Sequence, residues 1–307
     1  MISVSTAWNA LKHASGEELI RELTELGFGS FELSVKLSEA KLREIESILL
    51  QIEIASLHNF CPVPHGPAEN GGGDFYFLSS PDPKERKLAV EASKKTIDWA
   101  RRFGARAVVF HFGRVEMESQ TGRRQLMDQI MKVRAAGHND EADRLMSEEL
   151  AVREEIKAPY LEAALQSARE LVEAAKGEVQ IGVENRYYYG EIPSIDEIAL
   201  FMDEIPAQSG GYWHDFGHAW TSDFVGWAKH EDYLTRYGDR IIGLHIHDIN
   251  GFKDHSSLTS GTIDFENLVP MIPKDVISVL EIHHATPEEL VKSREIWKSL
   301  LSRNLAG

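Results

Sequence analysis

The chain has 307 residues, a hydrophobic content of 42% and a formal net charge of −16. This negative charge opposes non-specific attraction to phosphate backbones, so nucleic acid is disfavoured as a partner. No stretch approaches the ~18 consecutive apolar residues of a membrane span, and the first residues lack the basic and then apolar pattern of a secretory signal. A single cysteine, Cys61, excludes an internal disulfide. We therefore expect a cytoplasmic protein without a membrane partner.

Apolar runs of strand length alternate with amphipathic segments along nearly the whole chain. The predicted strands are Ile2–Thr6, Ser30–Leu33, Ile52–His58, Ala107–His111, Val179–Glu184, Gly211–Asp215, Ile241–His247 and Val276–Glu281. The predicted helices are Gly16–Leu26, Ser38–Leu50, Pro83–Phe103, Pro159–Lys176, Ser194–Ile205, Ser222–Tyr237, Phe265–Met271 and Pro287–Leu301. Strands that alternate with helices pair in parallel, and eight such units closing on themselves form a (β/α)8 TIM barrel. We predict one such domain over residues 1–307; the alternative, an open doubly wound sheet, lacks a glycine-rich phosphate loop after a strand.

Two segments are too long for minimal connections between a strand and a helix. Residues 59–80, after the third strand, contain several prolines and three consecutive glycines, and we expect either a lid over the barrel mouth or a surface excursion. Residues 114–158, after the fourth strand, are highly charged with periodic apolar positions. They predict an insertion of two helices broken near Gly137. This insertion either shapes substrate access or an oligomer contact, or is a solvated decoration.

Four ligand-type side chains stand where four successive predicted strands end: Glu184, Asp215, His245 and Glu281. The carboxyl ends of parallel barrel strands converge on a common mouth, where barrel enzymes place their chemistry. Three carboxylates and one imidazole meeting there would repel one another without a cation, so the pattern indicates a metal site. Because side chains alternate along a strand, His247 faces the same side as His245, and periodicity does not decide which of the two is the ligand.

The histidines are unevenly placed, with most near the ends of the predicted strands. Eight of the 13 lie at or just past the ends of strands three to eight: His58, His111, His214, His218, His245, His247, His283 and His284. Any one of them has a hydrogen-bonded structural role as its simplest explanation. We expect that role for His214, which should point away from its neighbour Asp215. The set as a whole, together with the carboxylates, is harder to assign to structure alone.

Several short motifs, in order along the chain, resemble the xylose-isomerase-like barrel superfamily, which includes ketose 3-epimerases and the endonuclease IV family. The motifs are Glu184-Asn185-Arg186, Trp213-His214-Asp215-Phe216-Gly217-His218, His245-Ile246-His247-Asp248, Asp254-His255, Gly261-Thr262-Ile263-Asp264 and Leu280-Glu281. The resemblance extends from Glu32 to Glu281. The chain departs from simple epimerases in its long insertion and in carrying Gly251, where some ketose epimerases have an arginine.

This resemblance implies one divalent cation held by Glu184, Asp215, His245 and Glu281. It favours His245 over His247, because the ligand in the superfamily lies three residues before an acidic residue that Asp248 matches here. Ligation rich in oxygen with one imidazole favours Mn²⁺ or Mg²⁺, and additional histidines move the balance toward Zn²⁺, with Co²⁺ also compatible.

The leading hypothesis is a metal-dependent isomerase or epimerase of a sugar, sugar phosphate or keto-polyol. A proton leaves the carbon next to a carbonyl, the cation stabilises the resulting enediolate, and Glu184 and Glu281 act as general base and acid. The expected substrate contacts are His58, His111, Arg186, His218 and His247. The partner is then a small carbohydrate, and a homo-oligomer is possible because barrels of this kind often pair.

Three alternatives remain open from the sequence. One is a multinuclear zinc phosphodiesterase similar to endonuclease IV, in which His58, His111 and His218 bind additional ions; the net charge and the arrangement of Asp254 and His255 count against it. Another is metal-dependent dehydration of a keto-polyol, which begins with the same proton abstraction. The third is a non-enzymatic barrel with a structural metal site, which the presence of all four ligands disfavours.

Overall fold

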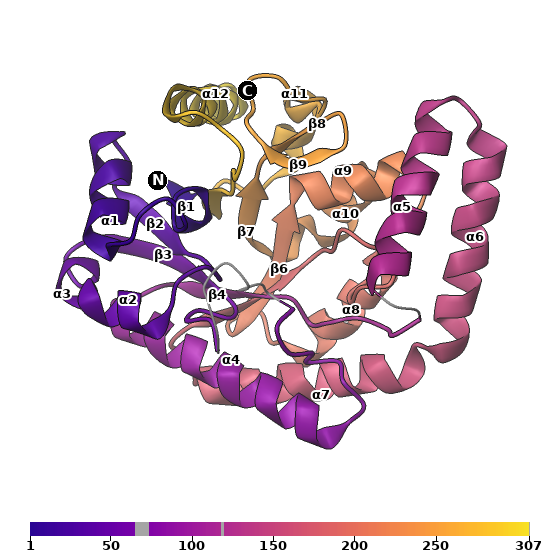
Figure 1. Ribbon diagram of the computed structural model, residues 1–307, viewed down its shortest axis with the longest axis horizontal. Helices are drawn as coiled ribbons and strands as arrows, with labels where there is room; N and C mark the ends of the chain where they lie inside the picture. Colours follow the sequence, from indigo (N-terminus) through magenta and orange to yellow (C-terminus); the bar gives the residue numbers. More distant parts are fainter. Residues whose placement is uncertain (65–73, 118–119, 307) are drawn as a thin grey trace.

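Eight parallel strands close into a barrel in the computed structural model, which describes residues 1–64, 74–117 and 120–306. The strands follow the order β1-β10-β7-β6-β5-β4-β3-β2 around the barrel (Figure 1). They are β1 (Ile2–Ser5), β2 (Ser30–Leu33), β3 (Glu53–His58), β4 (Ala107–Phe110), β5 (Gln180–Glu184), β6 (Gly210–Asp215), β7 (Ile241–Ile246) and β10 (Ile277–Leu280). The predicted (β/α)8 barrel is confirmed, and the open sheet is wrong.

Helices surround the barrel and follow most of its strands. They are α1 (Gly16–Glu25), α2 (Glu39–Glu44), α3 (Glu46–Leu49), α4 (Pro83–Phe103), α5 (Gln120–Ala135), α6 (Asn139–Ile156), α7 (Ala158–Ala175), α8 (Ile195–Glu204), α9 (Phe216–Phe224), α10 (His230–Tyr237), α11 (Phe265–Leu268) and α12 (Pro287–Ala306). Short 3-10 turns are η1 (Thr6–Trp8), η3 (Gly238–Arg240) and η4 (Val269–Met271). Their ends follow local sequence: a capping box of Ser194 and Glu197 starts α8, and Gly104 at φ 68° ends α4.

The barrel interior is a small apolar core under the carboxyl-terminal mouth. Ala55, Ala107, Val109, Ile277 and Val279 pack there around the indole of Trp213, and all six are buried. A side chain at Gly243 of β7 would collide with that indole, so the glycine makes room for the ring. The Trp213 ring lies 5.2 Å from the ring of His245, and it thus forms the floor on which the polar site rests.

The insertion forms α5 and α6, which lie side by side along one flank of the barrel (Figure 1). Gly137, at φ 84°, separates the two helices. Met127 and Met131 of α5 pack with Tyr189 of the segment after β5 in a cluster separate from the main core. From α6, the buried Arg153 donates to both carboxylate oxygens of Glu197 at 2.7 Å. These contacts fix the insertion against the segment after β5 and the first turn of α8.

Three predicted elements differ from the structure. The helix predicted over Ser222–Tyr237 is wrong, because the chain breaks at Gly226 (φ 83°) into α9 and α10. The helix predicted over Ser38–Leu50 is two short helices separated at Ile45. An antiparallel hairpin after β7, formed by β8 (Asp248–Asn250) and β9 (Lys253–Ser256), was not predicted. None of the helices in the described ranges has the length and apolar character needed to cross a membrane.

Candidate metal centre and pocket

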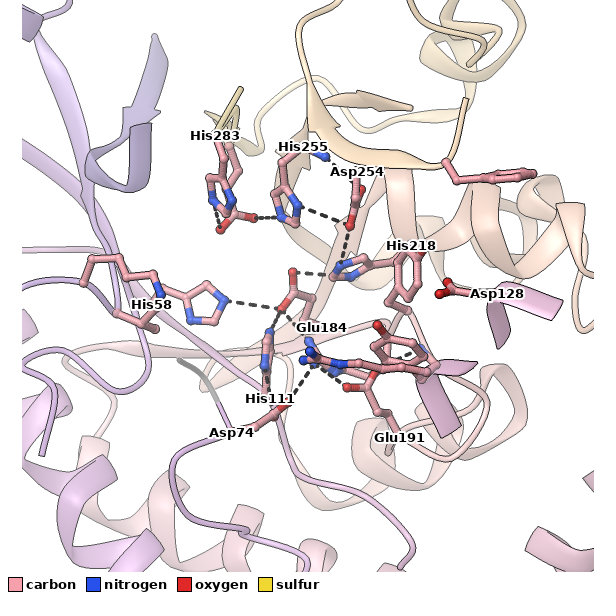
Figure 2. A pocket seen from close by; sticks show the side chains of 18 residues that line it. His58, Asp74, His111, Asp128, Glu184, Glu191, His218, Asp254, His255 and His283 are labelled. Atoms are coloured by element: carbon pink, nitrogen blue, oxygen red, sulfur yellow. Dashed lines mark hydrogen bonds and ion pairs between the residues drawn. The ribbon is translucent and has the colours of Figure 1, made fainter. Parts of the chain in front are cut away.

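A pocket of about 560 Å³ opens at the carboxyl end of the barrel (Figure 2). Six of the nine predicted metal ligands and substrate contacts line it: His58, His111, Glu184, Arg186, His218 and Glu281. The other three, Asp215, His245 and His247, lie beneath it and are fully buried. The structure therefore gathers all nine residues at one end of the barrel.

The Nδ1 atom of His245 is the point on which the carboxylates converge. It lies 2.7 Å from Glu184 Oε1, 3.0 Å from Glu281 Oε2 and 3.8 Å from Asp215 Oδ2. The three carboxylates come from β5, β6 and the residue just after β10, and the imidazole comes from β7. An O3N donor set of this kind, buried and facing one ring nitrogen, fits a divalent cation.

A fifth residue, Glu32 of β2, orients the imidazole from the opposite side. Its Oε2 lies 3.1 Å from His245 Nε2 and accepts a hydrogen bond of 2.8 Å from the Ser56 hydroxyl. A ring N–H that donates to a carboxylate leaves the other ring nitrogen free to bind a metal. Sequence reasoning assigned no role to Glu32; the signal that was available is an acidic residue inside a buried apolar strand.

The carboxylates and imidazoles of this cluster shift the pKa values of one another. Burial alone would raise the pKa of Glu184, but His245 and His111 hold it well below its usual value. Burial likewise acts to lower the pKa of His245, but Glu281, Glu32 and Glu184 raise it well above its usual value. The carboxylates are thus kept ionised, which is the form that binds a cation.

His247 pairs with Asp215 rather than with the convergence point. Its Nε2 lies 3.1 and 3.0 Å from the two Asp215 oxygens, and its Nδ1 accepts a hydrogen bond of 3.2 Å from the backbone N–H of His255. Asp215 also caps α9, because its Oδ1 accepts from the N–H of His218 at 2.7 Å. The geometry therefore favours His245 as the ligand and gives His247 a supporting contact to Asp215.

A second group surrounds the other oxygen of Glu184. His111 Nε2 lies 2.8 Å and His58 Nε2 lies 3.6 Å from Glu184 Oε2. Asp74 Oδ1 lies 3.3 Å from His111 Nδ1. Burial acts to lower the pKa of His111, but Glu184 and Asp74 raise it. Within the segment predicted as a lid or surface excursion, residues 65–73 lie outside the described part of the chain, and Asp74 beyond them lines the pocket.

Arg186 lies on this side of the pocket, and its guanidinium is paired with carboxylates. Its guanidinium lies 3.0 Å from Glu191 Oε1 and 3.4 Å from Glu184 Oε2, and Asp74 is 3.7 Å away. Glu191 is held in turn by the N–H of Tyr188. Burial would lower the pKa of Arg186, but Glu191, Asp74 and Glu184 raise it. The sequence did not indicate Glu191 or Asp74 as site residues.

A third group comes from the unpredicted hairpin. His255, at φ 52°, has Nδ1 3.2 Å from Asp254 Oδ2 and Nε2 3.7 Å from Glu281 Oε2. His218 Nε2 lies 3.9 Å from Asp254 Oδ2 across the pocket. The His255 ring stacks between His247 and His283, with centroids 4.3 and 4.0 Å away. His218, Asp254 and His255 together, like His58, His111 and Glu184, offer ligand atoms close enough to hold an ion.

A closed parallel barrel with carboxylates and imidazoles gathered at its carboxyl end has the architecture of barrel enzymes, which carry their active sites at that end. The chain matches the xylose isomerase-like TIM barrel family over residues 20–300 and belongs to that family. The resemblance seen in the sequence is therefore confirmed. Comparison with curated protein sequences found no match.

Solved structures share the fold at low sequence identity. A D-tagatose 3-epimerase-like protein is 20% identical, with 99% of this chain and 98% of that chain covered and a TM-score of 0.68. The 3-keto-D-glucoside 4-epimerase of E. coli is 14% identical, with coverage of 97% and 98% and a TM-score of 0.64. A Thermus thermophilus protein soaked with ZnCl2 is 19% identical, with coverage of 98% and 97% and a TM-score of 0.58.

Proposed function

We propose that the protein is a divalent-metal-dependent isomerase or epimerase that acts on a sugar or keto-polyol by removing a proton next to a carbonyl. One observation carries this proposal: Glu184 and Glu281 both line the pocket, and both approach the same nitrogen of His245. Two carboxylates placed around one cation can serve the two proton transfers that such a reaction needs. The epimerases with the same fold are consistent with the proposal.

Glu184, Asp215, His245 and Glu281 would hold the cation, and Glu32 and His247 would keep His245 and Asp215 in place. A bound divalent cation supplies Lewis-acid polarisation of a substrate carbonyl. Glu184, which lines the pocket and is kept ionised, would accept the substrate proton. Glu281, from the other side of the site, would return a proton.

Substrate hydroxyls would meet the polar groups that face the pocket. His218, whose Nδ1 lies 2.9 Å from the carbonyl oxygen of Asn185, presents its Nε2 edge toward Asp254. Arg186 and His58 present their polar edges on the Glu184 side. His247 is fully buried under Asp215, so we assign it to positioning rather than to substrate contact.

The test is solvent-proton exchange by a panel of ketoses and keto-polyols in D2O, with the protein loaded with Mn²⁺ and the C–H signals followed by NMR. We expect Glu184→Gln and Glu281→Gln each to slow exchange by about 10²–10⁴-fold while circular dichroism shows a folded barrel. Glu148→Gln, at an exposed position on α6, is the matched control and should exchange like the wild type. Near-normal exchange by either pocket variant would show that the acid–base pair is misassigned.

A multinuclear hydrolase is the second candidate, and the two additional ligand groups around the pocket favour it. Several ions held there would activate water for hydrolysis of a phosphodiester. Metal analysis of unchelated protein by inductively coupled plasma mass spectrometry separates the candidates. About one Mn, Mg or Co per chain supports the isomerase, whereas about two or three Zn per chain together with cleavage of abasic DNA supports the hydrolase. Dehydration of a keto-polyol would be seen in the same NMR experiment as conversion to a product that has lost the hydroxyl group from the carbon next to the exchanging one.

A further inference from the structure

We propose that helix α5 of the insertion builds a distal subsite for a second, uncharged polyhydroxylated ring. The substrate is then a ketose joined to another sugar rather than a free monosaccharide or a sugar phosphate. This inference rests on the proposed isomerase or epimerase function, because it places the reacting ketose at the centre of Glu184 and Glu281. The new element is the assignment of α5 as the part of the protein that binds the second sugar.

An aromatic wall leads from the candidate metal centre to α5. The ring of Tyr187 meets the ring of His218 with centroids 5.9 Å apart, and the ring of Tyr188 follows at 4.8 Å. The Tyr187 hydroxyl donates to Met131 Sδ of α5 at 3.8 Å. Aromatic side chains give a large, rigid contact surface at low cost in conformational entropy. The wall therefore suits the C–H face of a sugar ring placed beyond His218.

Two polar side chains of α5, Arg124 and Asp128, line the same pocket. They are one helical turn apart, and neither forms an ion pair with any residue in the described part of the chain. Figure 2 shows Asp128 on the side of the pocket opposite His58. A guanidinium and a carboxylate with open hydrogen-bonding positions offer both donors and acceptors to hydroxyl groups.

The charges around the pocket argue for a neutral ring rather than a phosphate. Asp128 offsets the charge of Arg124, and Asp74, Glu191 and Asp254 also line the cavity. Arg186 is already paired with Glu191. A distal anion would therefore find these cations already compensated by carboxylates, whereas hydroxyl groups need no net positive charge.

The size of the cavity agrees with this assignment. About 560 Å³ lies within the range of roughly 300–1,000 Å³ that encloses ligands of drug size. A single open-chain ketose is much smaller and would leave the part of the pocket next to α5 filled with water.

The wall is held firmly enough to act as a recognition surface. Met127, Ile130 and Met131 of α5 are buried, and Arg134 donates to the carbonyl oxygen of Val225 at 2.8 Å. Contacts of this kind fix α5 before the substrate arrives, so little affinity is lost in ordering the subsite.

The experiment compares three probes that share a fructose end: fructose, fructose 6-phosphate and isomaltulose, which carries a glucose ring on the fructose. Their affinities for the Mn²⁺-loaded full-length protein are measured by isothermal titration calorimetry. We expect isomaltulose to bind about tenfold tighter than fructose and fructose 6-phosphate to bind no tighter than fructose. Arg124→Ala and Asp128→Ala should each remove most of the isomaltulose advantage. Arg144→Ala, at an exposed arginine on α6, is the matched control and should retain it.

Equal affinity for the three probes, including no measurable affinity for any, would overturn the subsite. So would tightest binding of the phosphate, which would identify an anion site, or an unchanged isomaltulose advantage in both α5 variants. The proposed function has its own readout, which is C–H exchange of the same probes in D2O. Isomaltulose selectivity without exchange refutes the reaction and retains the subsite, whereas exchange without selectivity refutes the subsite alone.

Discussion

Two groups of buried histidines lie on opposite sides of β6 and behave in opposite ways. Behind the strand, His214 Nδ1 lies 2.7 Å from the Tyr212 hydroxyl and its Nε2 lies 3.1 Å from His230 Nε2. Burial lowers the pKa of His214 well below its usual value and that of His230 to about 4. At the barrel mouth His245 is just as buried, but carboxylates raise its pKa well above the usual value.

The difference shows that burial does not separate a structural histidine from a site histidine. Desolvation favours the neutral ring in both groups. At the mouth three carboxylates outweigh it, and buried groups whose pKa values are shifted in this way are typical of functional sites. Alternation along the strand produces the contrast within two residues, because His214 faces the helices while Asp215 faces the mouth.

The largest effect that tests this comparison is on metal affinity. His245→Asn should lower the affinity of the metal-free protein for Mn²⁺ by more than about 100-fold, which exceeds the 10–100-fold typical of residues that only support a ligand. His230→Asn is the matched control, since it alters a histidine of the other group and should bind Mn²⁺ like the wild type. Calorimetric titration measures both. Equal losses in the two variants would mean that the ion, if it binds, is held elsewhere.

A smaller effect is expected for the residue that orients His245. Glu32→Gln retains the shape of the side chain but weakens the acceptor for His245 Nε2, so Mn²⁺ affinity should fall about tenfold. Glu53→Gln, an exposed glutamate on the neighbouring strand β3, serves as the control for a lost surface charge. If Glu32→Gln binds Mn²⁺ like the control, Glu32 has no part in orienting the ligand.

The sequence allowed the barrel and the strand-end residues to be predicted because both follow from short-range patterns. Parallel strands that are buried on both faces appear in the sequence as apolar runs. In a closed barrel the carboxyl ends of these strands all lie at the same mouth. Glu184, Asp215, His245 and Glu281 were found in this way. The split at Gly226 was missed because apolar periodicity continues across it, and the conformation of that glycine becomes visible only in the structure.

The site features that could not be predicted from the sequence depend on contacts between segments that are distant along the chain. Glu32 reaches His245 across the barrel, although the two are 213 positions apart in the sequence. Asp254 and His255 face the pocket only because a hairpin of three- and four-residue polar strands turns them inward, and so short a hairpin has no distinctive pattern. The charged helices of the insertion left its role open between substrate access, an oligomer contact and solvated decoration. Packing against the segment after β5 is what brings α5 to the pocket.

The last expected effect is on the pH dependence of folding stability, and it arises from the histidine group behind β6. Burial holds the folded-state pKa of His230 at about 4, below the ordinary value of 6.5, although Asp223 and Asp215 both act to raise it. The unfolded chain therefore binds this proton first, and stability falls as the pH drops from about 6.5 to about 4, by on the order of 2–3 kcal/mol from this group.

Replacing His230 with Gln should flatten this part of the profile, measured by urea unfolding of the metal-free protein at each pH. His138→Gln, at the exposed turn before α6, should leave the slope unchanged. A wild-type slope in His230→Gln would show that His230 does not take up a proton on unfolding in this pH range.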